Sequence, residues 1–194
     1  MNINVGRYII LAVILLTRQS WTSAQLSLDY SSISAVKTLQ GKDYDFLNLK
    51  NKPHVFIFYS SDCPLSQKYT LTISNIYNKY TDKINFVGVF PGKEHSSEEY
   101  QNFKDKYNIN YMLIKDEKLN LTSHLKATVT PEVFLIDKSG KIIYHGAIDD
   151  WAIKLGKTKQ QPTINYLENA IESLLNNKNV QSDYIKPIGC YIEQ

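Results

Sequence analysis

Two nearly continuous apolar runs in the first half of the chain predict buried β-strands. Residues 54–59 have the sequence HVFIFY, and residues 84–90 have the sequence INFVGVF. Aromatic and β-branched residues in such a run favour a strand that is covered on both faces of its sheet. A strand of that kind needs helices on both sides, so the pattern predicts an α/β protein.

Helical periodicity follows each of these strands. From Pro64 to about Tyr80 apolar side chains recur every three or four residues, and a proline is tolerated in the first helical turn. The sequence Ser96–Glu99 has the Ser-x-x-Glu pattern of a capping box, which predicts a helix running to about Tyr107. A further helix is expected over 163–176, where five aliphatic side chains share one face. This alternation of strands and helices indicates a parallel arrangement.

The remaining elements have weaker patterns. Residues 130–137 and 141–145 flank a Lys-Ser-Gly turn and predict a β-hairpin. A short apolar run at 111–114 predicts a third strand, and 119–125 predicts one helical turn. Residues 44–49 alternate between polar and apolar, which predicts a short strand near the beginning of the domain.

The charge balance excludes one class of partner. The chain has 194 residues, enough for one compact domain with a hydrophobic core, and a formal net charge of +3. Arg7 and Arg18 lie within the first 24 residues, and residues 25–194 hold 20 lysines, 19 acidic residues and no arginine. We therefore expect no nucleic-acid partner held by bulk charge.

The first 24 residues have the layout of a secretory signal peptide. Arg7 precedes an apolar run of nine residues, 8–16, and the segment ends in small or polar residues at Ala24. A helix needs about 20 apolar residues to span a bilayer, so we expect no stable membrane insertion after cleavage. The expected location is secreted or periplasmic, where disulfides can persist. The chain has two cysteines, Cys63 and Cys190, so at most one bridge can form within it.

Cys63 is the strongest candidate for chemistry because it lies between the first predicted buried strand and the helix that begins at Pro64. Unpaired backbone N–H groups and the helix dipole favour an anion there, which makes a thiolate available as a nucleophile. Asp62 would oppose this effect and Lys68 would support it, so the net shift stays open. The alternative is that Cys63 is a small buried apolar residue.

Residues 56–66, FIFYSSDCPLS, resemble the active-site strand, loop and helix start of the thioredoxin-like redoxins. This superfamily includes peroxiredoxins of the alkyl hydroperoxide reductase and thiol-specific antioxidant type. The resemblance covers roughly residues 33–177. It implies a thioredoxin-like α/β fold with a central mixed sheet flanked by helices. The expected organisation is a signal peptide at 1–24, a redoxin domain at 25–180 and a C-terminal tail at 181–194 that carries Cys190.

The resemblance also implies the substrate site. Residues 129–137 and 140–146 resemble the stretch that carries the family's cis-proline loop and the hairpin after it, so Pro131 is expected to be cis. In that family the backbone before this proline faces the active cysteine and pairs with the substrate chain. Thr130 and Pro131, together with Ser60 and Ser66 near the cysteine, are therefore the expected substrate-binding residues.

Departures from the family pattern exclude or disfavour some of the activities found in the family. Ser66 stands where a dithiol thioredoxin has its second cysteine, so resolution within the helix turn is excluded. Efficient peroxidase action is disfavoured because Phe56 replaces the family's proline and no arginine follows residue 24. Gln67 stands where a copper-delivery protein of this fold has its second cysteine. No metal or cofactor is therefore expected.

Cys190 has three possible roles. Residues 187–192 have a short resemblance to a C-terminal extension of some exported redoxin-like proteins. Cys190 would then resolve a mixed disulfide or a sulfenic acid formed at Cys63. The two alternatives are a permanent structural bridge to Cys63 and a bond to another chain.

The leading hypothesis is an exported thiol–disulfide oxidoreductase with Cys63 as nucleophile and Cys190 as resolving cysteine. Its expected partners are protein thiols or disulfides and an external thiol reductant. One alternative is a slow, antioxidant thiol peroxidase that uses Cys63 to reduce hydroperoxides. A second alternative is a non-catalytic thioredoxin-fold binding module with a structural disulfide.

Overall fold

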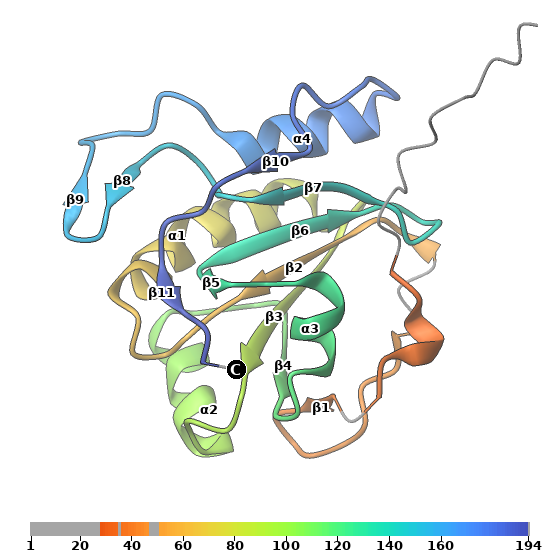
Figure 1. Ribbon diagram of the computed structural model, residues 1–194, viewed down its shortest axis with the longest axis vertical. Coiled ribbons are helices and arrows are strands. Elements are labelled where there is room, and N and C mark those ends of the chain that lie inside the picture. Colours follow the sequence, from red (N-terminus) through yellow and green to blue (C-terminus); the bar gives the residue numbers. More distant parts are fainter. Residues whose placement is uncertain (1–27, 35, 47–50, 194) are drawn as a thin grey trace, which may run out of the picture.

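The computed structural model describes residues 28–34, 36–46 and 51–193. Seven strands of this part form a mixed sheet in the order β1-β4-β3-β2-β6-β7-β10 (Figure 1). Strands β2, β3 and β4 are parallel, whereas β6 is antiparallel to β2 and to β7. The predicted mixed sheet flanked by helices is therefore confirmed. The predicted signal peptide lies outside the described residues.

The strands of the main sheet are β1 Lys37–Thr38, β2 His54–Phe58, β3 Asn85–Pro91, β4 Met112–Asp116, β6 Glu132–Ile136, β7 Ile142–Gly146 and β10 Tyr184–Ile185. Two small sheets pair β5 Val129–Thr130 with β11 Cys190–Tyr191, and β8 Ala152–Lys154 with β9 Lys157–Thr158. The helices are the 3-10 turn η1 Tyr30–Ser32, α1 Pro64–Tyr80, α2 Ser97–Lys106, α3 Asn120–Leu125 and α4 Tyr166–Leu175. Over the described residues, none of these helices has both the length and the apolar character that crossing a bilayer requires.

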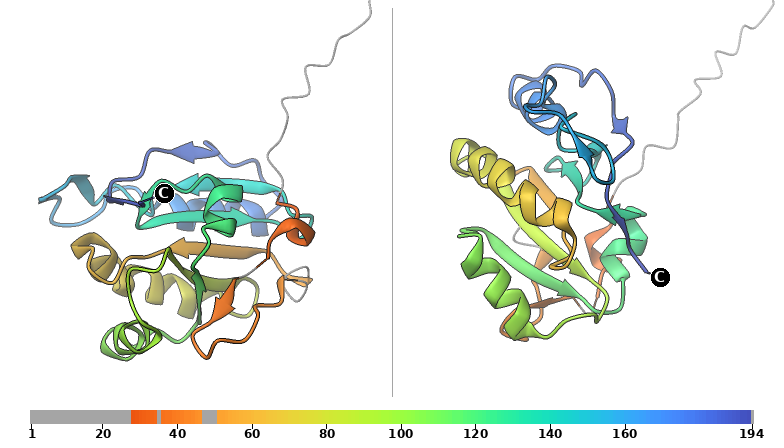
Figure 2. Two further views of the ribbon diagram at one scale, coloured as in Figure 1. Left: turned by 60° about the horizontal axis from the view of Figure 1, so that its bottom comes forward. Right: turned by 90° about the vertical axis from the view of Figure 1, so that its left-hand side faces the viewer.

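Strand β2 is buried on both faces of the sheet, as its sequence predicts. Val55 and Ile57 belong to the cluster under α1, α2 and α4, whereas Phe56 and Phe58 belong to the cluster formed with α3 and the N-terminal segment. All five residues of β2 are buried. Figure 2 shows these layers on the two sides of the sheet. Because β2 is packed on both faces, it holds the start of the loop that follows it in a fixed position.

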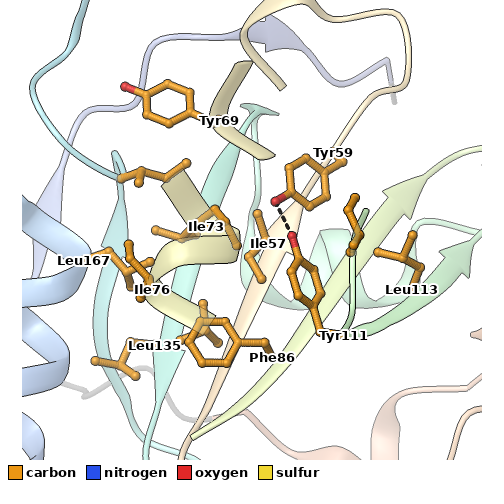
Figure 3. Packing of buried hydrophobic residues seen from close by; sticks show 14 of the residues in the cluster. Ile57, Tyr59, Tyr69, Ile73, Ile76, Phe86, Tyr111, Leu113, Leu135 and Leu167 are labelled. Carbon is orange, nitrogen blue, oxygen red and sulfur yellow. Dashed lines mark hydrogen bonds between the residues drawn. The ribbon is translucent and has the colours of Figure 1, made fainter. Parts of the chain in front are cut away.

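Helix α1 is anchored along its length by the larger cluster (Figure 3). Ile73 is fully buried, and Ile76 is 6% exposed, against the sheet. In the same cluster, the hydroxyl groups of Tyr59 and Tyr111 form a 2.7 Å hydrogen bond, so the buried polar ends of both rings are satisfied (Figure 3). This packing fixes the helix and, with it, the position of the residue at its N-terminus.

The structure differs from the sequence prediction near the N-terminus. The strand there is β1, which pairs with β4, while Tyr44 and Phe46 of the predicted strand 44–49 are not in a strand. Their rings pack edge to face at 4.9 Å, and both side chains contact the second cluster. The alternation of polar and apolar residues therefore reflects these two aromatic contacts rather than a strand. Residues 47–49 lie outside the described residues.

The predicted helix 163–176 begins later, at Tyr166. The backbone N–H groups of Thr163 and Ile164 donate to Asp150, at 2.7 and 3.1 Å, rather than into a helical turn. Because Asp150 holds these two residues in a loop, the first helical turn forms only after them.

His54, the first residue of β2, is expected to make the fold sensitive to acid. Its side chain is fully buried and forms a 2.5 Å hydrogen bond with the Tyr30 hydroxyl. Burial lowers the pKa of His54 from 6.5 to about 4. A depressed folded-state pKa contributes stability that is present above pH 6.5 and is lost as the pH falls towards 4. The loss is about 3 kcal/mol.

Replacement of His54 by glutamine, which keeps a hydrogen-bonding partner for Tyr30, tests this effect. Urea unfolding at pH 7 and pH 4 measures the free energy of unfolding of both proteins. The wild type is expected to lose about 3 kcal/mol more than His54→Gln over this interval. Equal losses would show that His54 does not cause the acid sensitivity.

Candidate functional site

Cys63 caps the N-terminus of α1, directly after the loop that leaves β2. Its side chain is 2% exposed. The loop is fixed from two sides: the Cys63 N–H donates to the carbonyl of Ser60 at 3.3 Å, and the Gln67 side-chain amide donates to the carbonyl of Ser61 at 2.7 Å. The predicted position of Cys63 at a junction between strand and helix is therefore confirmed.

Cys63 and Cys190 form a disulfide within the chain. Their Cα atoms are 6.1 Å apart, within the usual range for such bonds, although the residues are 127 positions apart in the sequence. This bond answers one question left open by the sequence, because Cys190 pairs with Cys63 rather than with another chain. Both an exchanging pair and a structural bridge are compatible with it.

The C-terminal tail, residues 181–193, reaches Cys63 in two steps. Strand β10 first adds to the edge of the main sheet beside β7. The tail then passes to β5, where β11 pairs antiparallel with Cys190 opposite Thr130 and Tyr191 opposite Val129 (Figure 1). The N–H of Ile192 donates to the carbonyl of Thr128 at 3.0 Å. Backbone pairing therefore delivers the second sulfur to the first.

The Thr130–Pro131 peptide bond is cis, as the resemblance implied. The Thr130 carbonyl oxygen lies 3.1 Å from the sulfur of Cys63, and the threonine side chain is almost fully buried. Within the described residues, the Thr130 hydroxyl has no hydrogen-bond partner. Thr130 thus faces Cys63 with its backbone, and the same backbone pairs with the tail.

Ser60 and Ser66 lie in the loop and the helix start that flank Cys63. The Ser66 hydroxyl accepts a hydrogen bond from the backbone N–H of Ser60 at 3.3 Å. Ser66 is fully buried, whereas Ser60 is half-buried. The geometry therefore places Ser66 behind the loop, where it supports the backbone, and leaves Ser60 nearer to the surface.

The carboxylate of Asp62 lies beside the ring of His95, just before α2. Its Oδ2 lies 3.2 Å from Nε2 of His95, and Nδ1 of that ring lies 3.4 Å from Glu99. The Asp62 side chain is 80% exposed, so water also screens its charge. Repulsion of a Cys63 thiolate by Asp62 is consequently weaker than the adjacent sequence positions indicate.

Glu132 is a residue of the site that the sequence analysis missed. It is 2% exposed, and its Oε2 accepts hydrogen bonds from the backbone N–H groups of Thr128 at 2.8 Å and Val129 at 3.4 Å. These contacts fix the backbone at the start of β5. The signal in the sequence was a lone acidic residue at the start of an apolar strand, directly after Pro131.

A small hollow of about 170 Å³ adjoins Pro131 under the tail. Asp149 lines it and is 4% exposed; the Tyr69 hydroxyl donates to its carboxyl oxygen at 2.6 Å. Burial raises the pKa of Asp149, and the hydrogen bond from Tyr69 opposes that shift. Ile188 of the tail also lines the hollow, so the hollow belongs to the place where the tail lies.

Metal-binding geometry is absent from the part of the chain that the structure describes. No group of three His, Cys, Asp or Glu side chains is arranged there to hold a metal ion.

The comparisons with known proteins agree with this geometry. The family model described as Redoxin matches residues 29–152. The curated proteins contain no significant match. Among solved structures, an uncharacterised conserved protein from Geobacillus kaustophilus has a TM-score of 0.75 at 20% identity, with 87% of this chain and 92% of that chain covered.

Two further structures share the architecture. A secreted Mycobacterium tuberculosis disulfide oxidoreductase, described as homologous to E. coli DsbE, has a TM-score of 0.53 at 18% identity, covering 75% of this chain and 96% of that chain. A thioredoxin-like protein from Porphyromonas gingivalis has a TM-score of 0.55 at 18% identity, covering 76% and 90%. At these identities the likeness shows a shared thioredoxin-like fold.

Proposed function

Because this chain belongs to the Redoxin family, we propose that it is an exported thiol–disulfide oxidoreductase in which Cys63 is the nucleophile and Cys190 resolves the mixed disulfide. One observation carries the proposal. The tail brings Cys190 to Cys63 as a strand paired with Thr130, next to the cis-proline. The position of the bridge at the junction of a buried strand and a helix supports exchange, since a helix N-terminus favours a thiolate.

Two opposing effects act on the Cys63 sulfur once the bond is reduced. The backbone N–H groups at the start of α1 and the helix dipole stabilise a negative sulfur. The Thr130 carbonyl, 3.1 Å away, presents its negative end and destabilises it. An incoming strand that donates a backbone N–H to this carbonyl would weaken the second effect. Substrate pairing at β5 would therefore favour the reactive form of Cys63.

The exchange balances in two steps. The Cys63 thiolate attacks one sulfur of a substrate disulfide, so a mixed disulfide forms while the substrate bond breaks and its other sulfur leaves and takes a proton. The Cys190 thiolate then attacks the Cys63 sulfur, which releases the second substrate thiol and forms the Cys63–Cys190 bond. The substrate is reduced by two electrons and the protein is oxidised. An external thiol reductant would restore the dithiol state, and the same steps reversed would oxidise a substrate dithiol.

The other expected residues take distinct places in this proposal. Thr130 and Pro131 would bind the substrate backbone, and Ser60 would line the approach to Cys63. Ser66 and Glu132 would act as positioning residues, because each contacts the backbone that flanks the sulfur. The partners would be protein thiols or disulfides outside the cytoplasm. Residues 1–24 would direct the export of the protein and would then be cleaved. The secreted oxidoreductase among the structural neighbours supports this location.

Trapping of the mixed disulfide tests the proposal. In a Cys190→Ser variant the second step is blocked, so incubation with oxidised glutathione or a disulfide-bonded peptide is expected to leave a covalent adduct on Cys63. Mass spectrometry of the intact chain detects it. The matched Cys63→Ser variant, which keeps the other thiol, is expected to form the adduct at least about 100-fold more slowly, because its remaining cysteine lacks the helix N-terminus.

Other outcomes of this experiment distinguish the alternatives. Rapid formation of a sulfenic acid on Cys63 at low hydroperoxide doses, without an adduct from disulfides, would support a peroxidase instead. If the two variants react equally slowly with both reagents, the protein is a binding module whose disulfide is structural.

A further inference from the structure

At Gly189 the backbone of the tail lies closer to β5 than a residue with a side chain could come. A Cβ atom placed on Gly189 would lie 2.3 Å from the carbonyl oxygen of Thr130 and 3.2 Å from the nitrogen of Pro131. Both are backbone atoms, so no flexible side chain can move aside. Gly189 is not among the residues with positive φ, so the close approach itself, rather than a left-handed backbone, requires glycine.

The backbone that Gly189 meets is held by two sets of contacts. Glu132 accepts hydrogen bonds from the N–H groups of Thr128 and Val129, and β11 pairs with β5. A shift of the Thr130 carbonyl would disturb these contacts and the placement of this oxygen beside Cys63. The restriction therefore applies to any strand that lies in the place of the tail.

Neighbouring tail positions differ in how far the site encloses them. Ile188, two positions before Cys190, is half-buried and lines the hollow beside Pro131, which includes Tyr69. Tyr191, directly after the cysteine, is 84% exposed. Ile192 is half-buried against the cluster on the other face of the sheet. The site thus encloses the residues before the cysteine and leaves the next one free.

We propose that the β5 edge is a peptide-binding site that selects substrate cysteines preceded directly by glycine in an extended segment, and that Gly189–Cys190 is this chain's own copy of that ligand. The inference rests on the proposed function and gives its substrate class. After reduction of the Cys63–Cys190 bond the tail leaves, and a segment of another protein pairs with Thr130 in its place. An apolar residue two positions before the cysteine fills the hollow.

Electrons balance as in the exchange described above. The Cys63 thiolate bonds to the sulfur of the substrate cysteine that lies opposite Thr130. The disulfide to which that cysteine belonged breaks, and its other sulfur leaves as a thiol. The register of the tail defines which of the two substrate sulfurs is attacked: the one that follows glycine.

The test uses a variant of the full chain in which the tail no longer occupies the β5 edge. Gly189→Val combined with Cys190→Ser prevents the tail from docking and leaves Cys63 as the single thiol. Its probe is a blocked peptide with the sequence of residues 187–192, Pro-Ile-Gly-Cys-Tyr-Ile, supplied as a mixed disulfide with glutathione. Two comparison peptides carry alanine in place of either the glycine or the tyrosine. Mass spectrometry follows the adduct between Cys63 and the peptide.

The glycine peptide is expected to react about 10- to 100-fold faster than the peptide with alanine before its cysteine, because a forced contact of this kind costs a comparable factor. The peptide that lacks tyrosine is expected to react within about threefold of the parent, since the equivalent Tyr191 is exposed. Equal rates for the glycine and alanine peptides would overturn the selectivity while leaving the proposed function in place. If no peptide or glutathione adduct forms, the proposed function itself fails.

A second measurement keeps the inference testable if the double variant does not fold. In the Gly189→Ala chain the Cys63–Cys190 bond is expected to be about 10- to 100-fold less favoured against glutathione than in the wild type. Ser182→Ala, a change in the same tail at a half-buried position before β10, serves as the control and is expected to leave this equilibrium within about threefold. An unchanged equilibrium in Gly189→Ala would overturn the inference.

Discussion

Loss of the Cys63–Cys190 bond is expected to lower the free energy of unfolding by about 4 kcal/mol. The bond closes a loop between residues 127 positions apart, and the chain entropy that such a crosslink removes from the unfolded state corresponds to about 5 kcal/mol. Part of this gain is offset, because the reduced folded chain recovers freedom in the tail that follows β10. About 4 kcal/mol is a large share of the stability of a domain of this size.

Urea unfolding of the oxidised wild type and of Cys190→Ser measures this difference. The variant is also expected to show no further change when a reductant is added, because it has no bond to lose. A loss below about 1 kcal/mol would mean that the crosslink does not restrict the unfolded chain as its loop length implies. The same comparison on the Cys63→Ser chain should give a similar loss, which separates the bond from local packing of either sulfur.

Replacement of Glu132 by leucine is expected to cost about 3 kcal/mol of folding stability. The change leaves the N–H group of Val129 buried without an acceptor, which costs about 1 to 3 kcal/mol, and it also removes the acceptor of the partly buried N–H group of Thr128. The larger consequence for function is loss of the fixed β5 backbone. With the Thr130 carbonyl no longer held, the tail docks less well and the disulfide becomes easier to reduce.

The matched control is Glu132→Gln, whose side-chain carbonyl still accepts from both N–H groups. Its expected loss is below about 1.5 kcal/mol. Thermal and urea unfolding give the stabilities, and thiol alkylation gives the fraction of reduced Cys63 for each variant. Equal losses for leucine and glutamine would show that Glu132 acts through its charge rather than as an acceptor for the β5 backbone.

The strands and helices with long, regular patterns could be predicted from the sequence. Buried positions require apolar residues, so the burial of each element leaves a periodic apolar pattern in the sequence. Strand β2 is apolar on both faces since clusters lie on both sides of it. The capping box at Ser96 forms as predicted, with both hydrogen bonds present. The cis bond before Pro131 came from the family resemblance, because a Thr-Pro sequence alone favours trans.

The tail could not be predicted in the same way. Strands β10 and β11 have two residues each, too few for any periodicity, and they form only because the edges of β7 and β5 accept them. The need for glycine at residue 189 depends on a backbone oxygen far away in the sequence. Glu132 is similar: its side chain is stable in a buried position because the N–H groups of Thr128 and Val129 donate to it there.

The reduction potential of the Cys63–Cys190 pair tests the central claim most directly. The full chain is equilibrated in a series of glutathione buffers, its free thiols are alkylated, and mass spectrometry gives the oxidised fraction at each cysteine separately. An exchanging pair is expected to titrate reversibly between about −120 and −270 mV, with both cysteines changing together. A bond that stays oxidised to below about −300 mV would contradict the account and identify a structural bridge.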